Sequence, residues 1–118
     1  MRTVLIVDDH AGFRALARRL LQDAGYEVIG EADDGSSAMR LTSELQPDVV
    51  LLDVQLPDSS GLVLSRSLID GDRPPVVVLV STRDASDYGA AVTRSGAQGF
   101  IAKADLTAQG FADLAGAP

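Results

Sequence analysis

Acidic side chains follow two apolar stretches of this sequence, at the point where each stretch ends. Asp8 and Asp9 come directly after the run 3–7, and Asp53 comes directly after the run 49–52. Three carboxylates gathered in one place would repel one another unless a cation neutralised them. Because this set offers oxygen ligands and no Cys or His, the cation we expect is a hard one, Mg²⁺ or Mn²⁺.

Two further polar groups also follow apolar runs. Ser81 comes after the run 76–80, and Lys103 comes after the run 98–102. Lys103 could pair its charge with a phosphoryl group, and Ser81 could donate its hydroxyl to the same oxygens. Asp53 is then equipped to attack phosphorus and form an aspartyl phosphate. The reaction needs no general base, because the carboxylate is already ionised.

Each of these residues also has a simpler explanation, since Asp and Ser commonly end a strand and begin a turn. For Asp53 taken alone, the two interpretations are about equally good. In a parallel sheet, however, the C-terminal ends of all strands lie at one edge, where open α/β sheets place their ligands. One shared site explains four polar strand ends better than four separate turns do.

The elements that must position these groups alternate along the chain. Short apolar runs rich in β-branched residues predict five strands, at 3–7, 26–30, 48–53, 76–80 and 98–102. Apolar residues at helical spacing predict five helices, at 13–24, 38–45, 61–69, 86–95 and 106–114. This alternation predicts an α/β fold with parallel strands and helices on both faces of the sheet.

Two of these helices carry more specific expectations. In the first, Leu16 and Leu20 fall on the apolar stripe that should face the sheet, together with Phe13, Ala17 and Leu21. The last helix is predicted to be weak, because Gly110 in its middle costs about 1 kcal/mol relative to Ala.

Composition narrows the function classes. The 118 residues suit one domain, at 1–118, and contain no cysteine, which excludes thiolate metal sites and disulfides. A net charge of −7 argues against direct binding of nucleic acid by this chain. No apolar run approaches the roughly 20 residues that span a bilayer. We therefore expect a soluble, cytoplasmic protein that does not interact with a membrane.

Four motifs together give the sequence a specific resemblance over essentially its whole length. They are Val7-Asp8-Asp9-His10, Leu51-Leu52-Asp53-Val54-Gln55-Leu56-Pro57, Val80-Ser81-Thr82 and Gly99-Phe100-Ile101-Ala102-Lys103. With these motifs the chain resembles the response-regulator receiver domains of two-component signalling. The resemblance implies a flavodoxin-like (βα)5 sandwich whose five parallel strands have the order 2-1-3-4-5. Residues 8–14 resemble the receivers of helix-turn-helix transcriptional regulators.

The resemblance also implies roles for the site residues. Asp53 would be the phosphoacceptor, supplied by a sensor histidine kinase or a phosphotransfer protein. Asp9 would bind the metal directly, Asp8 through water, and Gln55 through its backbone carbonyl. The phosphoryl oxygens would be contacted by Ser81 and Lys103.

A conformational switch is a further implication of the resemblance. Ser81 would move toward the phosphoryl group while Phe100 rotates inward, altering the surface of the fourth helix, last strand and last helix. Gln55 and Arg83 would tune the lifetime of the phosphoryl group. One departure from the family pattern is Ala104, which stands where a proline usually follows the lysine.

Other functions stay open at this point. The chain could be a receiver that works without phosphorylation as a protein-binding module, or the receiver part of a DNA-binding regulator that dimerises when phosphorylated. A metal-dependent phosphatase is disfavoured, because Gln55 stands where such an enzyme needs a second acid. We therefore predict a regulatory protein and not an enzyme. His10 and Asp58 are predicted to be loop residues, the latter solvated.

Overall fold

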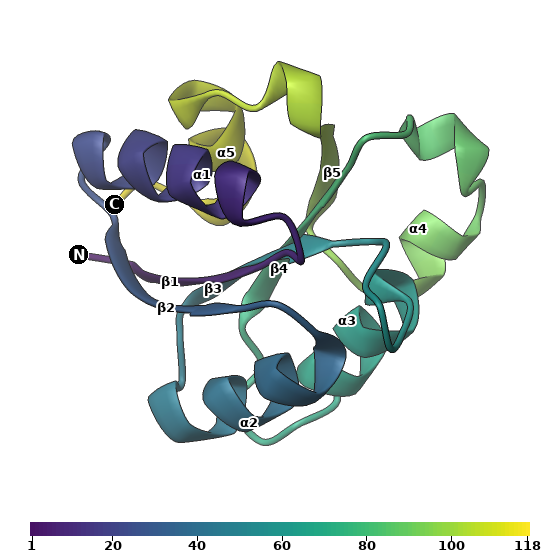
Figure 1. Ribbon diagram of the computed structural model, residues 1–118. Coiled ribbons are helices and arrows are strands. Elements are labelled where there is room, and N and C mark those ends of the chain that lie inside the picture. The colour runs from purple at the N-terminus through teal and green to yellow at the C-terminus, as the bar shows by residue number, and fades with distance from the viewer.

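A computed structural model describes residues 1–118, and its centre is a parallel sheet of five strands (Figure 1). The strands are β1 (Thr3–Val7), β2 (Glu27–Ala32), β3 (Val49–Asp53), β4 (Val76–Ser81) and β5 (Gly99–Ala102). They lie in the order β2-β1-β3-β4-β5, as predicted. The four strands that precede the polar residues of the site are therefore consecutive neighbours in the sheet.

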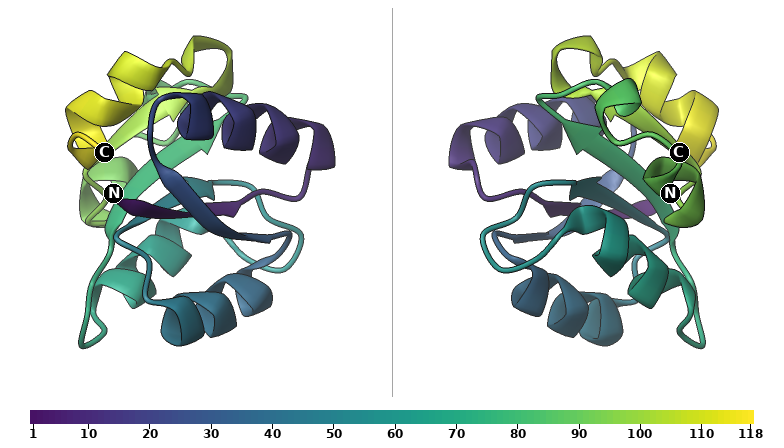
Figure 2. Two further views of the ribbon diagram at one scale, coloured as in Figure 1. Left: turned by 90° about the vertical axis from the view of Figure 1, so that its left-hand side faces the viewer. Right: turned by 90° about the vertical axis from the view of Figure 1, so that its right-hand side faces the viewer.

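Helices cover both faces of the sheet in three layers (Figures 1 and 2). They are α1 (Ala11–Asp23), α2 (Gly35–Leu45), α3 (Gly61–Ile69), α4 (Ala91–Arg94) and α5 (Ala108–Ala115). One face carries α1 and α5, and the other carries α2 and α3. None of the helices combines the length and the apolar character that a membrane-spanning helix requires.

The central strand β3 is buried on both faces, which explains its continuous apolar sequence. Val49 and Leu51 pack into the core beneath α1 and α5, whereas Val50 and Leu52 pack into the core above α2 and α3. All five residues of the strand are buried, including Asp53 at its end. The position of Asp53 is thus fixed by packing on both sides of the strand that carries it.

The predicted fourth helix at 86–95 is wrong in extent. The segment consists of a 3₁₀ turn at Ala85–Asp87 and a helix of only four residues, α4. Gly89, with φ of 59°, lies between them in the left-handed region that interrupts a helix. Asp84 and Asp87 form a capping box around the 3₁₀ turn. Local capping and Gly89 together outweigh the apolar spacing on which the prediction rested.

The predicted burial of Leu16 is also wrong, since 59% of this residue is exposed. Ala17 and Leu21, four positions apart, are the residues of α1 that are buried against the sheet. Leu16 precedes Ala17 by one position, so it is rotated by about 100° around the helix axis. It lies at the solvent side of the stripe.

The last helix is stabilised mainly by its packing. Thr107 caps it, because its hydroxyl oxygen accepts a hydrogen bond from the Gly110 N–H at 3.0 Å. Phe111 is fully buried and meets the Tyr26 ring edge-on, with 5.0 Å between the ring centroids. These contacts compensate for the low helix propensity of Gly110.

Replacing Phe111 with Ala is expected to lower the free energy of unfolding by about 3–5 kcal/mol, because the ring leaves a cavity in the core. Leu16→Ala is the matched control and should change that free energy by no more than about 0.5 kcal/mol. Urea denaturation followed by circular dichroism measures both. Equal losses for the two variants would contradict the assigned packing.

Candidate functional site

The C-terminal ends of the strands bring Asp8, Asp53 and Lys103 into direct contact. The Lys103 ammonium nitrogen Nζ lies 2.6 Å from Asp8 Oδ2 and 3.3 Å from Asp53 Oδ2. These residues follow β1, end β3 and follow β5, so they are 45 and 50 positions apart along the chain. The predicted convergence of Asp8, Asp53 and Lys103 is therefore present in the structure.

This cluster is buried and has an excess of negative charge. Asp8 is 0% exposed and Asp53 is 2% exposed, whereas only one ammonium lies between them. Burial is the main cause that raises the pKa of Asp53 above its ordinary value, and the charge of Asp8 raises it further. Lys103 and the Gln55 N–H, 3.2 Å from Asp53 Oδ1, lower this pKa but do not cancel the increase.

The donor set of the cluster fits a divalent cation. Asp8, Asp9, His10 and Asp53 each offer a ligand atom, and these atoms all lie within 4.8 Å of one another. Asp8 Oδ2 is buried and lies 2.6 Å from the Lys103 ammonium, which also contacts Asp53. Two buried carboxylates that share one ammonium keep an excess of negative charge, and a cation would neutralise it.

Ser81 is buried at the end of β4, but its hydroxyl is engaged away from Asp53. Its Oγ lies 2.8 Å from the Tyr88 hydroxyl and accepts a hydrogen bond from the Arg83 N–H at 3.1 Å. Tyr88 in turn lies beside Phe100, with 6.0 Å between the ring centroids. Tyr88 was not predicted as a site residue, and no sequence signal marks it apart from its place in an apolar pattern.

Comparison with known proteins identifies the family. Residues 4–109 match the response regulator receiver domain family. This chain belongs to that family. It is 38% identical over 104 residues to the response regulator GacA of Pseudomonas aeruginosa, a match that covers 87% of this chain and 49% of that protein. It is 33% identical over 101 residues to the transcriptional regulatory protein DegU of Brevibacillus brevis, covering 85% of this chain and 43% of DegU.

The receiver therefore spans about half the length of the curated relatives that it matches. Among solved structures it resembles the signal receiver domain of the response regulator NarL from Mycobacterium tuberculosis. That match has a TM-score of 0.87 and 34% identity, and covers 97% of this chain and 95% of the other. The response regulator domain of Thermotoga maritima CheB matches with a TM-score of 0.79 and 28% identity, covering 96% and 89%. Both the family and the flavodoxin-like fold predicted from the sequence are confirmed.

Two residues of α1 hold the site of this receiver in place. The Lys103 ammonium lies 4.6 Å from the centroid of the Phe13 ring, which is a cation–π contact. Arg14 Nη1 donates a hydrogen bond to the Asp8 carbonyl at 2.6 Å. The sequence patterns indicated only that Phe13 is apolar and that Arg14 lies off the apolar stripe.

The loop that follows Asp53 is fixed by two contacts. At Gly61, a Cβ atom would collide with the Asp53 carbonyl oxygen and approach the Val54 Cα to 2.8 Å, so any other residue would displace the loop. Asp58, predicted to be solvated, is exposed but accepts hydrogen bonds from the N–H groups of Gly35 at 2.7 Å and Ser36 at 3.1 Å. Asp58 therefore caps α2 and ties the site loop to that helix.

The remaining predicted residues lie around the mouth of the site. The side chains of Asp9, Gln55 and Arg83 are exposed, in contrast to the buried centre. Lys103 begins a 3₁₀ turn that includes Ala104 and ends at Asp105, and the chain contains no cis peptide bond. Ala104, at the position where the family usually has a proline, thus lies within a regular short turn.

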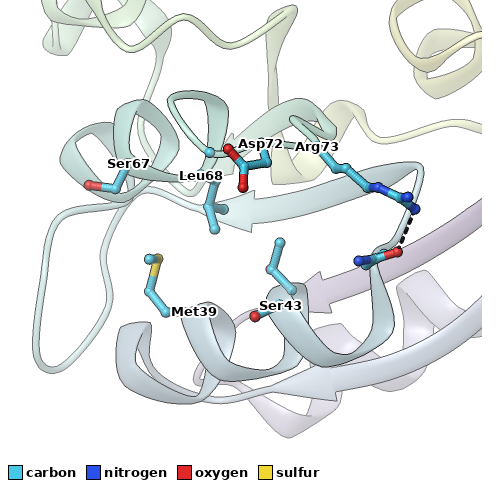
Figure 3. A pocket seen from close by; sticks show the side chains of 9 residues that line it. Met39, Ser43, Ser67, Leu68, Asp72 and Arg73 are labelled. Carbon is cyan, nitrogen blue, oxygen red and sulfur yellow. Dashed lines mark hydrogen bonds between the residues drawn. The ribbon is translucent and has the colours of Figure 1, made fainter.

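A surface cleft lies far from this site. It has a volume of about 330 Å³ and lies between α2, the end of α3 and the loop that follows α3 (Figure 3). Its lining residues are Met39, Thr42, Ser43, Gln46, Ser67, Leu68, Gly71, Asp72 and Arg73. These segments lead into the N-terminal ends of β3 and β4, at the opposite edge of the sheet from Asp53.

In EDTA at pH 7, Asp53→Asn is expected to unfold at a higher urea concentration than the wild type. The folded pKa of Asp53 lies above its ordinary value of 3.8, so its ionisation lowers the free energy of unfolding as pH rises from 3.8 through the folded pKa. The stabilisation by Asp53→Asn should therefore shrink toward pH 4.

Asp48→Asn provides a control with the opposite sign. Hydrogen bonds from Thr3, chiefly from its backbone N–H at 2.9 Å, lower the pKa of Asp48, so its carboxylate stabilises the fold above that pKa. This variant should be less stable than the wild type at pH 7. A loss of stability from Asp53→Asn at pH 7 in EDTA would contradict the charge balance described for the site.

Proposed function

We propose that this receiver accepts a phosphoryl group on Asp53 from a sensor histidine kinase or a phosphotransfer protein. The observation that carries the proposal is the contact of Asp53 with Lys103, at 3.3 Å, beside the buried carboxylate of Asp8. A carboxylate whose charge is incompletely neutralised, and whose direction is fixed by a buried strand, is well placed for nucleophilic attack.

In the transfer step, an Asp53 carboxylate oxygen would form a bond to phosphorus as the bond between phosphorus and the donor's imidazole nitrogen breaks. The electron pair of the broken bond leaves on the imidazole, and the product is an aspartyl phosphate. Lys103 would pair with an oxygen of the transferring group and so stabilise its charge. The Ser81 hydroxyl would donate a hydrogen bond to another of these oxygens.

The acidic cluster would hold Mg²⁺ or Mn²⁺, with Asp9 and Asp53 as direct ligands, the Gln55 backbone carbonyl as a third, and Asp8 acting through water. A cation bound there neutralises charge on the carboxylates and on the phosphoryl oxygens. The three carboxylates, of which the two buried ones share a single ammonium, support this assignment. Without a cation, Lys103 alone must balance Asp8 and Asp53.

Phosphorylation would act through Ser81. To reach the phosphoryl group, the Ser81 hydroxyl must leave Tyr88, which frees the Tyr88 side chain and the neighbouring Phe100 ring. The altered surface would be formed by α4, β5 and α5. Gln55 and Arg83, exposed at the mouth of the site, would set how readily water reaches the aspartyl phosphate.

The output of the switch is a protein contact in the cytoplasm, with residues 1–118 acting as one regulatory domain. DegU is named a transcriptional regulatory protein, which favours a transcriptional output for this receiver as well. The net charge of −7 makes direct contact of this domain with DNA unfavourable. A partner domain or a homodimer formed on phosphorylation would therefore carry the signal, and a binding module that needs no phosphorylation is the alternative.

Incubation with acetyl phosphate and Mg²⁺ should add one phosphoryl group to the wild type, read by intact mass spectrometry. Asp53→Ala and an EDTA-treated sample should gain none. Asp72→Ala, which removes an exposed acid at the opposite edge of the sheet, is the control and should still be phosphorylated. No adduct on the wild type despite bound Mg²⁺, also after beryllofluoride treatment, would favour the binding-module alternative.

Tyr88→Phe should raise the rate of phosphorylation by acetyl phosphate about two- to tenfold. The variant removes one hydrogen bond from the Ser81 hydroxyl, worth about 0.5–1.5 kcal/mol, that must otherwise break. Tyr26→Phe is the control, because the Tyr26 hydroxyl bonds the Gly116 carbonyl instead. A rate that is unchanged or lower in Tyr88→Phe would contradict the proposed route through Ser81.

A further inference from the structure

His10 is the one histidine of the chain, and its imidazole faces the acidic cluster. Nδ1 lies 3.1 Å from Asp9 Oδ1 and 3.2 Å from Asp8 Oδ1, although 66% of the side chain is exposed. His10 occupies the N-cap position of α1 but makes no side-chain capping hydrogen bond. Its side chain is therefore directed at the carboxylates and not at the helix that it precedes.

The backbone fixes this position. The His10 N–H donates a hydrogen bond to Asp8 Oδ1 at 2.8 Å, and Asp8 is fully buried. Arg14 reaches back from α1 to the Asp8 carbonyl at 2.6 Å. The segment that carries His10 is thus anchored on both sides, which leaves the imidazole at the mouth of the cluster.

The separations between the donor atoms suit shared coordination. Two ligands at right angles on a metal ion, each about 2.1 Å from it, are about 3.0 Å apart. The distance from His10 Nδ1 to Oδ1 of Asp9, the proposed direct ligand, is close to this value. The two buried carboxylates that share the single Lys103 ammonium give independent support for a cation at this place.

We propose that His10 binds the metal ion of this receiver through Nδ1, and that this nitrogen ligand shifts the preference of the site from Mg²⁺ toward Mn²⁺ and the later first-row metals. The inference rests on the proposed use of the acidic cluster as a metal site. It goes further because it adds a nitrogen ligand to the oxygen ligands and predicts a preference for first-row transition metals.

The shift in preference follows from ligand chemistry. Mg²⁺ is a hard cation that favours oxygen and keeps several of its waters. Imidazole is a good ligand for first-row transition metals, and affinities for a given nitrogen and oxygen site increase from Mn²⁺ to Cu²⁺. One imidazole beside three carboxylates therefore strengthens the binding of transition metals far more than that of Mg²⁺. Occupancy of the site would then respond to the supply of these metals.

The contact of Nδ1 with Asp8 Oδ1 is a hydrogen bond, and a hydrogen bond to Asp9 would have the same length as the observed contact. The test must therefore detect the bond between metal and nitrogen. Pulsed electron paramagnetic resonance of bound Mn²⁺ does so, because a coordinated ¹⁴N nucleus modulates the electron spin echo. Since the chain has a single histidine, ¹⁵N-histidine labelling assigns that signal to His10.

The wild type with Mn²⁺ should give a ¹⁴N modulation that changes to the ¹⁵N pattern in the labelled sample. His10→Ala should lose the modulation, and its Kd for Mn²⁺ should rise at least about tenfold while the Kd for Mg²⁺ changes little. Titration calorimetry measures both constants. Asp9→Asn, which removes a proposed direct ligand, should weaken the binding of both metals.

Two outcomes separate this inference from the proposed function. If Mn²⁺ binds and depends on Asp9 but gives no nitrogen modulation, His10 is not a ligand, whereas the metal site stands. The inference is also overturned if His10→Ala binds Mn²⁺ as tightly as the wild type. If the wild type binds neither Mn²⁺ nor Mg²⁺, both the inference and the proposed metal site fail.

Discussion

A single ammonium group, that of Lys103, lies between the buried carboxylates of Asp8 and Asp53, and the arrangement of the site depends on this contact. Two carboxylates at this depth repel each other and resist ionisation, so one lysine balances them only in part. The sheet order makes the contact geometrically possible, because β1, β3, β4 and β5 are consecutive neighbours whose C-terminal ends meet. The uncompensated charge that remains is what makes the cluster a good binding site for a cation and a phosphoryl group.

The site is connected to the rest of the molecule by contacts at its edges. Asp58 ties the loop after β3 to the start of α2, and Tyr88 ties the end of β4 to the segment before α4. The first contact joins the loop to α2, a regular helix of 11 residues. The second leads to a segment that has only a short turn and four helical residues, and its backbone hydrogen bonds join residues close together in the chain. A change at Ser81 would therefore propagate more easily toward α4 than toward α2, because the α4 segment resists displacement less.

The strands and the centre of the site could be predicted from the sequence, because continuous apolar runs identify buried parallel strands and the fold sends their polar ends to one edge. The errors and omissions have local physical causes. Gly89 and local capping shorten the fourth helix despite its apolar spacing. Leu16 is exposed because it lies one position, about 100° around the helix axis, from the buried Ala17. The contacts made from loops and helix ends follow no periodic pattern that could be recognised in a sequence. This is where Tyr88, His10 and Asp58 lie.

The most direct test of the central claim is a crystal structure of the receiver with beryllofluoride and Mg²⁺, in which beryllofluoride mimics the phosphoryl group. The account predicts density for this group on an Asp53 oxygen, with Lys103 Nζ and Ser81 Oγ within hydrogen-bonding distance of its fluorines. It also predicts that Ser81 Oγ has left the Tyr88 hydroxyl. Density for Mg²⁺ in the acidic cluster with an unmodified Asp53, at saturating beryllofluoride, would contradict the claim that Asp53 is the phosphoacceptor.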